Sequence, residues 1–202
     1  MIDASDLEVV LLDPQNDLVR LFRHDGAHLE PPEEKYRNAR VDPPDGHKGD
    51  YAVLYLGKNI PTVAVECHIL SENPSGNYQW LRRRAESYKV ARYRSERPSL
   101  FLRIDGRNRK YLGLDGRDVA FKRYAPYQAM GLELFQRFGQ TVHGLTWSSF
   151  HRNQPGEVFA LWHHHKDTIG LTVTSKEPFG SLASDAEWSS FLTANPTIEE
   201  LA

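Results

Sequence analysis

The apolar segments of this chain are short, and Pro, Gly and charged residues separate them, so the possible folds are few. Strand-length segments lie at residues 8–12, 18–22, 51–56, 100–104, 143–150, 157–164 and 169–175. Only residues 126–138 place apolar side chains at i, i+3, i+4, i+7 and i+8, which predicts an amphipathic helix that ends at Gly139. Because the strands form hairpin-like groups and do not alternate regularly with helices, the pattern predicts an α+β fold and not a doubly wound sheet.

Two shorter helices are also predicted. Residues 60–70 carry Pro61, which suits a first helical turn, and apolar side chains at helical spacing. Ser184 would be the N-cap of a helix over residues 185–192, within a terminal helix or tail at 185–202. The polar stretch 30–50 is too long for a turn and indicates a functional or mobile loop. With 202 residues and no internal repeat or Gly/Ser linker, we expect one domain over residues 1–202.

The composition excludes several classes of protein. Cys67 is the only cysteine, which rules out an intrachain disulfide framework and a cysteine-rich zinc site. No run approaches the roughly 18 apolar residues of a membrane span, and the first residues lack the pattern of a signal peptide. We therefore expect a soluble, cytoplasmic protein that does not enter a membrane.

Charge is unevenly distributed along the chain, although the net charge is only −2. Residues 82–123 carry 14 Lys and Arg against 5 acidic residues, whereas residues 1–50 carry 12 acidic residues against 6 basic ones. The basic stretch is compatible with nucleic acid, a phosphate-bearing small molecule or an acidic protein as partner, and equally with a solvated arginine-rich face. Tyr88, Tyr93 and Phe101 lie among its arginines, as a site for single-stranded nucleic acid would require.

Common catalytic motifs are absent from the sequence, including the dinucleotide fingerprint, the phosphate loop, GxSxG and HExxH. In a strand, His163 and His165 would share a face and could begin a metal site, but only Asp167 lies nearby as a further ligand. We therefore predict a surface or strand-end histidine cluster and no metal. Cys67 follows a carboxylate on an apolar helix, so we expect a buried structural thiol with a raised pKa.

Five polar residues stand in apolar surroundings and need a partner or a purpose. They are Arg23, Arg40, Tyr55, Glu66 and Ser149. Each has an ordinary structural explanation when it is considered alone, such as an ion pair, a core tyrosine or a strand-end hydroxyl.

In their order along the chain, these residues resemble the motifs of the RES domain, a toxin family named for Arg, Glu and Ser. Leu21-Phe22-Arg23 is similar to its opening element, and Arg40-Val41-Asp42-Pro43-Pro44 is similar to a stretch like RFDxP. Val53-Leu54-Tyr55-Leu56 followed by Ala64-Val65-Glu66 resembles VLYLxxxxxxAxxE, and residues 144–149 (GLTWSS) resemble GLxYxS. The resemblance covers about residues 20–162.

The sequence departs from the family's pattern at several points. Val41 replaces an aromatic residue, Trp147 replaces a tyrosine, and only the spacing from Gly144 selects Ser149 over Ser148. Residues 71–98 have no counterpart in these motifs, so we predict an insertion or a partner-binding element there.

The resemblance implies a compact α+β domain like that of ADP-ribosyltransferases, with two small, mostly antiparallel β-sheets flanked by helices around an NAD⁺ cleft. It implies an enzyme that consumes NAD⁺ as a substrate, by phosphorolysis or hydrolysis of the nicotinamide–ribose bond, with no cofactor or metal. It also implies a partner, an Xre-type helix-turn-helix antitoxin that buries the active site. The alternatives are protein ADP-ribosylation and a non-enzymatic module that binds a partner or nucleic acid through residues 82–123, of which direct nucleic-acid binding is not favoured.

Under this hypothesis the catalytic residues are Glu66, Arg23 and Ser149. Glu66 would stabilise the oxocarbenium-like transition state, and Arg23 and Arg40 would bind the diphosphate. Tyr55 would stack on the nicotinamide or ribose, or hold the carboxylate in place. The Ser149 hydroxyl would bind the carboxamide or ribose, without acting as a nucleophile. All five residues lie outside the basic stretch, which is therefore expected to be a cleft rim or an antitoxin-facing surface.

Overall fold

The computed structural model describes residues 7–24, 26–115, 117, 123–151 and 154–202. The strands are β1 (Val9–Leu12), β2 (Leu18–Phe22), β3 (Val53–Gly57), β4 (Leu70–Glu72), β5 (Tyr78–Leu81), β6 (Lys89–Arg94), β7 (Ser99–Arg103), β8 (Gly144–His151), β9 (Gln154–Trp162), β10 (Thr172–Val173) and β11 (Glu199–Leu201). The helices are α1 (Ile60–Glu66), α2 (Arg82–Ser87), α3 (Gly106–Tyr111), α5 (Ala125–Phe138) and α6 (Ala186–Ala194), with 3-10 helices η2 (Glu34–Tyr36), η3 (His163–His165) and η4 (Leu182–Ser184).

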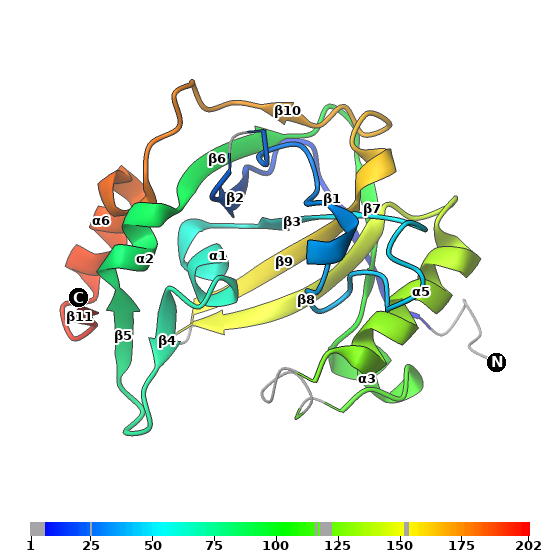
Figure 1. Ribbon diagram of the computed structural model, residues 1–202, viewed down its shortest axis with the longest axis horizontal. Coiled ribbons are helices and arrows are strands. Elements are labelled where there is room, and N and C mark those ends of the chain that lie inside the picture. The colour runs from blue at the N-terminus through cyan, green and yellow to red at the C-terminus, as the bar shows by residue number, and fades with distance from the viewer. Residues whose placement is uncertain (1–6, 25, 116, 118–122, 152–153) are drawn as a thin grey trace.

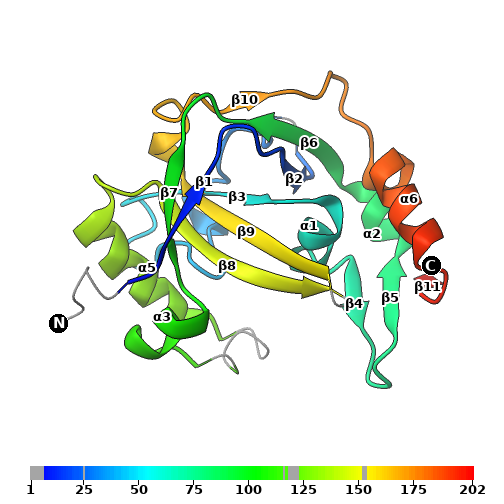
Figure 2. The ribbon, with the colours of Figure 1, turned by 180° about the vertical axis from the view of Figure 1, so that it is seen from behind.

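These elements form two β-sheets flanked by helices (Figures 1 and 2). The larger sheet has eight strands in the order β1-β7-β8-β9-β3-β2-β6-β10, and the smaller one has three in the order β11-β5-β4. Among the strands that the structure describes, only the pairs β7–β8 and β5–β11 are parallel. The predicted α+β class is confirmed. The larger sheet is mostly antiparallel but is not small, and the smaller sheet has one parallel and one antiparallel pair.

Strand β6 lies within residues 71–98, the stretch that has no counterpart in the family's motifs, and it belongs to the larger sheet. It pairs with β2 along residues 89–93 on one side and with β10 on the other. Val90, Ala91 and Tyr93 are buried, whereas Lys89 and Arg92 are half-buried and Arg94 is exposed. The charged residues hide the strand in a sequence that looks merely basic. Residues 89–94 of the stretch 71–98 are therefore part of the larger sheet, and the expectation of an insertion or partner-binding element over 71–98 stays a prediction.

Helices α1 and α5 cover the same face of the larger sheet. Alternate residues of β3 share a face, and on it Val53 belongs to the core that α5 completes with Tyr127, Met130 and Leu134. Leu54 and Leu56 point to the opposite face, where they join a separate cluster around Phe101 and Phe159. Space for a site is thus left between α1 and α5, over the middle of β3 and β8.

Two glycines allow α1 to approach the sheet closely. A Cβ atom on Gly57 would lie 2.4 Å from Val63 Cγ1, and one on Gly156 would lie 2.0 Å from Thr62 Oγ1. Both distances are shorter than real Cβ contacts, so any larger residue would push α1 outward. The helix begins at Asn59, whose side chain accepts from the Thr62 backbone N–H at 2.9 Å.

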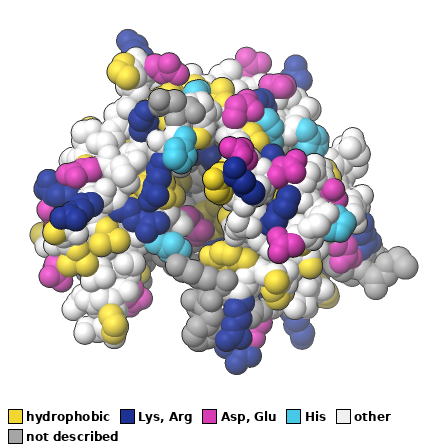
Figure 3. Space-filling model, in the orientation of Figure 1, with side chains coloured by type: hydrophobic (Ala, Val, Ile, Leu, Met, Phe, Trp, Pro, Cys, Tyr) yellow, Lys and Arg dark blue, Asp and Glu magenta, His cyan; other side chains and the backbone are white. Residues whose placement is uncertain are grey.

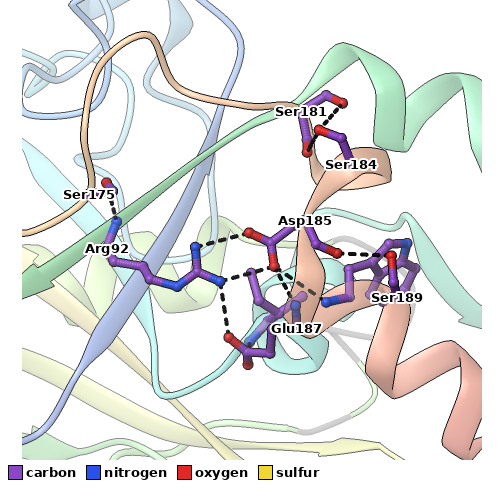
Figure 4. Close-up of polar contacts among 9 residues, drawn as sticks. Arg92, Ser175, Ser181, Ser184, Asp185, Glu187 and Ser189 are labelled. Atoms are coloured by element: carbon purple, nitrogen blue, oxygen red, sulfur yellow. Dashed lines mark hydrogen bonds and ion pairs between the residues drawn. The ribbon is translucent and has the colours of Figure 1, made fainter.

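Helix α6 connects the chain's end to β6 and to the start of α1 (Figure 4). Asp185 caps α6 by accepting from the Glu187 and Trp188 backbone N–H groups, so the expected cap at Ser184 is wrong. Arg92 binds Asp185 through two hydrogen bonds of 2.9 Å and also contacts Glu187 at 3.2 Å. The other Glu187 oxygen accepts from the Ile60 backbone N–H at 3.1 Å. Asp185 prevails over Ser184 because its carboxylate both caps the helix and pairs with a cation.

The histidine run lies in η3 and not in a strand, so His163 and His165 do not share a strand face. His165 Nε2 lies 2.7 Å from the Gly139 carbonyl oxygen at the end of α5, and His164 Nε2 lies 3.4 Å from it. His143 packs against His165 with 5.1 Å between ring centroids. Burial, and then the neighbouring His165, lower the pKa values of both His143 and His164.

No helix in the described part of the chain has the length and apolarity needed to cross a bilayer.

The Asp185 clamp is expected to contribute measurably to stability. Asp185→Ala removes both the cap and the Arg92 pair, which should lower the free energy of unfolding by about 2 kcal/mol. Asp185→Asn keeps a capping oxygen and loses mainly the charge, so its loss should be smaller. Urea denaturation of the three proteins measures both values, and equal losses would contradict the double role of this carboxylate.

The histidine cluster predicts a loss of stability in mild acid. Because the folded-state pKa values of His143 and His164 are lowered, the unfolded chain takes up protons first as the pH falls below about 6.5. The melting temperature should be constant above about pH 7 and should fall towards pH 5. The melting temperature of His164→Gln should fall less steeply as the pH is lowered. The control is His24→Gln, at an exposed histidine, and its melting temperature should follow that of the unmodified protein.

Candidate functional site

A cavity of about 290 Å³ lies between α1, β3 and β8 and is named here the Glu66 cavity. Its polar and aromatic lining residues are Arg20, Arg40, Tyr55, Glu66, Cys67, Tyr88, Tyr124 and Trp147. The space-filling view shows the molecule hollowed near the centre of this face, with hydrophobic and acidic side chains inside and Lys or Arg side chains along one rim (Figure 3). Three of the five residues predicted from sequence, namely Arg40, Tyr55 and Glu66, line this one cavity.

Glu66 is held between a cation and an indole. It is the last residue of α1, and its Oε2 lies 3.5 Å from Arg40 Nη2. Its Oε1 accepts a long hydrogen bond of 3.4 Å from Trp147 Nε1. The Arg40 guanidinium also lies over the Trp147 ring, 4.6 Å from the centroid. The three side chains therefore orient one another, and a quarter of the Glu66 side chain remains exposed to the cavity, at 27%.

One nitrogen of the Arg40 guanidinium is not hydrogen-bonded. Its Nε is buried and has no hydrogen-bond partner among the residues that the structure describes. A buried donor without a partner costs free energy, and a ligand in the cavity cannot reach this atom while it stays buried.

Tyr55 holds the loop that carries Arg40. Its hydroxyl donates to Asp42 Oδ1 at 2.9 Å and accepts from the Val41 backbone N–H at 3.3 Å. The other Asp42 oxygen accepts from the Ala39 backbone N–H at 2.7 Å. Burial, and then the Asp42 charge, raise the pKa of the Tyr55 hydroxyl well above its ordinary range. Tyr55 thus holds a carboxylate, but that of Asp42 and not that of Glu66.

Arg20 is a cavity residue that the sequence analysis did not select. It stands in the middle of β2 and is only 9% exposed. Its Nε donates to the Ala27 carbonyl at 3.1 Å and its Nη1 to the Tyr55 carbonyl at 3.1 Å, and burial lowers its pKa. Within the described chain it has no carboxylate partner. The available signal was an arginine inside the apolar segment LVRLF, three residues before the arginine that the motif match selected.

Arg23 lies outside the Glu66 cavity. It lines a neighbouring cavity of about 860 Å³, named here the Arg23 cavity, together with Arg20, Glu30, Glu33 and other residues. Its guanidinium lies 4.3 Å from the ring centroid of Tyr88, which lines the Glu66 cavity. The two cavities therefore meet at Arg20, with Arg23 at their boundary.

Ser149 is buried on β8 and shares a face with Trp147, two residues before it. It is not one of the residues that line the Glu66 cavity. The structure thus brings Arg40, Tyr55 and Glu66 together in one cavity, places Arg23 in a neighbouring cavity and leaves Ser149 outside both.

Two further aromatic residues complete the walls of the Glu66 cavity. Tyr124 precedes α5, and Tyr88 lies between α2 and β6. Tyr55 and Trp147 meet edge to face with 6.3 Å between centroids. Such walls can stack against a flat heteroaromatic ring.

Neither a metal nor a reactive thiol is indicated in the described part of the chain. It contains no group of three or more His, Cys, Asp or Glu that could hold a metal ion. Cys67 lines the Glu66 cavity, and burial raises its pKa to about 11, in the direction expected from the sequence. At neutral pH it is therefore a thiol and a weak nucleophile.

Four of the arginines in the basic stretch pair with acidic residues from the two ends of the chain. Arg82 binds Glu200, Arg92 binds Asp185, Arg94 binds Asp17, and Arg103 binds Glu8. These pairs place positive charge on several surfaces and not along one groove, which weakens the case for a nucleic-acid site.

Removing the Tyr55 hydroxyl should destabilise the protein. Tyr55→Phe leaves the buried Asp42 carboxylate with one donor fewer, which should cost about 1–3 kcal/mol. Tyr51→Phe is the matched control, because the Tyr51 hydroxyl donates to the neutral Val41 carbonyl, and its loss should cost only about 1 kcal/mol. Equal costs in urea denaturation would show that the Asp42 charge adds nothing.

The raised pKa of Cys67 predicts slow alkylation. At pH 8 the folded protein should react with iodoacetamide about 100-fold more slowly than the urea-unfolded chain, because little thiolate is present. Mass spectrometry of timed samples measures this ratio. Cys67 is half-buried in the structure, not fully buried as the sequence predicts. Similar rates for the two states would contradict a thiol that stays protonated in the folded protein.

No protein-family model matches this sequence, and no curated protein matches it. The fold is similar to that of a chain in the crystal structure of the M. tuberculosis MbcT–MbcA toxin–antitoxin complex, with a TM-score of 0.54 and 15% sequence identity. The similarity covers 79% of this chain and 81% of that chain. At this identity the comparison establishes a shared fold.

Proposed function

We propose that this protein is a RES-type toxin that degrades NAD⁺ by cleaving the nicotinamide–ribose bond, with phosphate or water as acceptor. The observation that carries the proposal is the Glu66 carboxylate, which faces a cavity with aromatic walls and is oriented by Arg40 and Trp147. The similarity in fold to a chain of a toxin–antitoxin complex supports it.

The two adjoining cavities suit the two ends of a dinucleotide. The Glu66 cavity has a volume of about 290 Å³, at the lower end for ligand pockets, so it would take only the nicotinamide riboside end. The adenosine end would lie in the Arg23 cavity. The diphosphate would then pass Arg20, where the two cavities meet. Arg20 is a buried cation without a carboxylate partner among the described residues, so a diphosphate would neutralise it.

Arg20, with Arg23 at the boundary, would therefore bind the diphosphate, and Arg40 would act beside Glu66. The acidic residues of the Arg23 cavity do not strongly repel a diphosphate, because each already forms an ion pair with a lysine. Glu30 pairs with Lys166 and Glu33 pairs with Lys35.

The residues also suit the bond that would break. The nicotinamide ring of NAD⁺ is positively charged and leaves as a neutral molecule. Positive charge develops on the ribose as the C–N bond lengthens. A fixed carboxylate beside the ribose stabilises that charge in the transition state more than in the ground state. Arg40 and Trp147 keep Glu66 from rotating away, and Tyr88 or Tyr124 would stack on the nicotinamide. Ser149 does not line this cavity, so the proposal gives it no role at the reacting atoms.

Purified protein should release nicotinamide from NAD⁺, measured by chromatography with and without phosphate. Glu66→Gln preserves the shape of the site and removes the charge, so it should lower the rate by about 100-fold or more. Glu86→Gln is the matched control, because Glu86 is an exposed residue of α2 that pairs with Arg82. If the unmodified protein leaves NAD⁺ intact under both conditions, the proposal fails.

A partner antitoxin of the Xre type is part of the proposal, supported by the MbcT–MbcA complex in which the similar chain occurs. Protein ADP-ribosylation is the alternative outcome of the same chemistry. Labelled NAD⁺ that becomes attached to a protein would separate it from simple NAD⁺ loss.

A further inference from the structure

A further cavity is also lined by Glu66. It has a volume of about 310 Å³ and is named here the His68 cavity. It shares Arg40, Glu66 and Tyr124 with the Glu66 cavity and adds His68, Glu72 and Tyr78 from the end of α1 and from strands β4 and β5. The Arg40–Glu66 pair therefore lines both cavities.

His68 occupies a backbone position that favours glycine. It has φ +52°, the only positive φ of a non-glycine residue in the described chain. Its N–H bonds to the Val65 carbonyl at 2.9 Å, and the Ile69 N–H bonds to the Ala64 carbonyl at 2.8 Å, which is the Schellman arrangement at the end of α1. Glycine is the usual residue at this point, because a side chain is strained there. Strained residues cluster at functional sites, and the His68 side chain lines the His68 cavity.

The charges of the His68 cavity disfavour an anionic ligand. Glu66 offsets Arg40, and the exposed Glu72 adds a second carboxylate. A phosphate dianion would meet two carboxylates beside a single, already paired guanidinium, with His68 as the only other group able to carry a positive charge there. Water or another uncharged hydroxyl compound meets no such repulsion.

We propose that the His68 cavity admits the acceptor, that the acceptor is water or another uncharged hydroxyl compound, and that His68 takes its proton. This inference rests on the proposed NAD⁺ cleavage. The C–N bond breaks and its electron pair leaves with neutral nicotinamide. The acceptor oxygen forms the new bond to the ribose carbon, and its proton passes to the His68 imidazole. The leaving group and the acceptor then occupy different cavities, as a displacement from opposite faces of the ribose requires.

The test compares His68→Gly with the unmodified protein in NAD⁺ and phosphate, with ADP-ribose and phosphorylated ADP-ribose measured separately by mass spectrometry. Glycine suits the positive φ, so the variant should fold and its melting temperature should rise. The unmodified protein should form mainly ADP-ribose. The variant should form ADP-ribose about 100-fold more slowly, because a general base is lost, and free imidazole should restore much of that rate. His47→Gln, in the loop before β3, is the control and should behave like the unmodified protein.

The outcomes separate the two proposals. If the unmodified protein releases nicotinamide but His68→Gly forms ADP-ribose at the same rate, or imidazole has no effect, the role of His68 is wrong and NAD⁺ cleavage stands. If phosphorylated ADP-ribose is the main product of the unmodified protein, the charge argument is wrong. If no nicotinamide is released at all, both proposals fail.

Discussion

The contact between α1 and the larger sheet determines the geometry of the candidate site. Gly57 and Gly156 allow the helix to lie directly on β3 and β9, and Glu187 holds its first turn through the Ile60 N–H. The helix has only two turns, so its stability comes from this packing and not from its own hydrogen bonds. Glu66 stands at its last residue, and a shift of α1 would move the carboxylate away from Arg40 and Trp147.

The second constraint is the free-energy cost of burying the guanidinium groups of Arg20 and Arg40 beside this helix. Arg20 is dehydrated and is compensated by two backbone carbonyls, not by an ion pair within the described residues. Arg40 has a carboxylate but retains a buried Nε without a partner in the described structure. Natural sequences accept such costs where function requires them, and the fold offsets them elsewhere, for example through the Tyr55–Asp42 contact and the Asp185 clamp.

The sequence predicted strands well where apolar residues form uninterrupted segments. Residues 18–22 are β2 as expected, and residues 126–138 match α5 to within one residue. The sequence did not predict β6, because Lys89, Arg92 and Arg94 interrupt its buried residues. It also placed residues 163–165 in a strand, whereas they form a 3-10 helix, for which the sequence shows no local pattern. The motif order identified Arg40, Tyr55 and Glu66, which meet in one cavity. It did not identify Arg20, because the motif match selected Arg23, although Arg20 stands inside the apolar segment LVRLF.

The amino-acid sequence by itself determined the α+β class, the principal strands and helix, and a small set of polar residues that stand out in apolar segments. These properties depend on neighbours along the chain, through periodicity and local turn chemistry. Only the tertiary structure decided that Arg20, and not Arg23, lines the Glu66 cavity. It also decided that Tyr55 binds the Asp42 carboxylate and that Glu66 lines two cavities. Those features depend on contacts between residues that are distant in sequence, and such contacts form only when the sheet closes around α1.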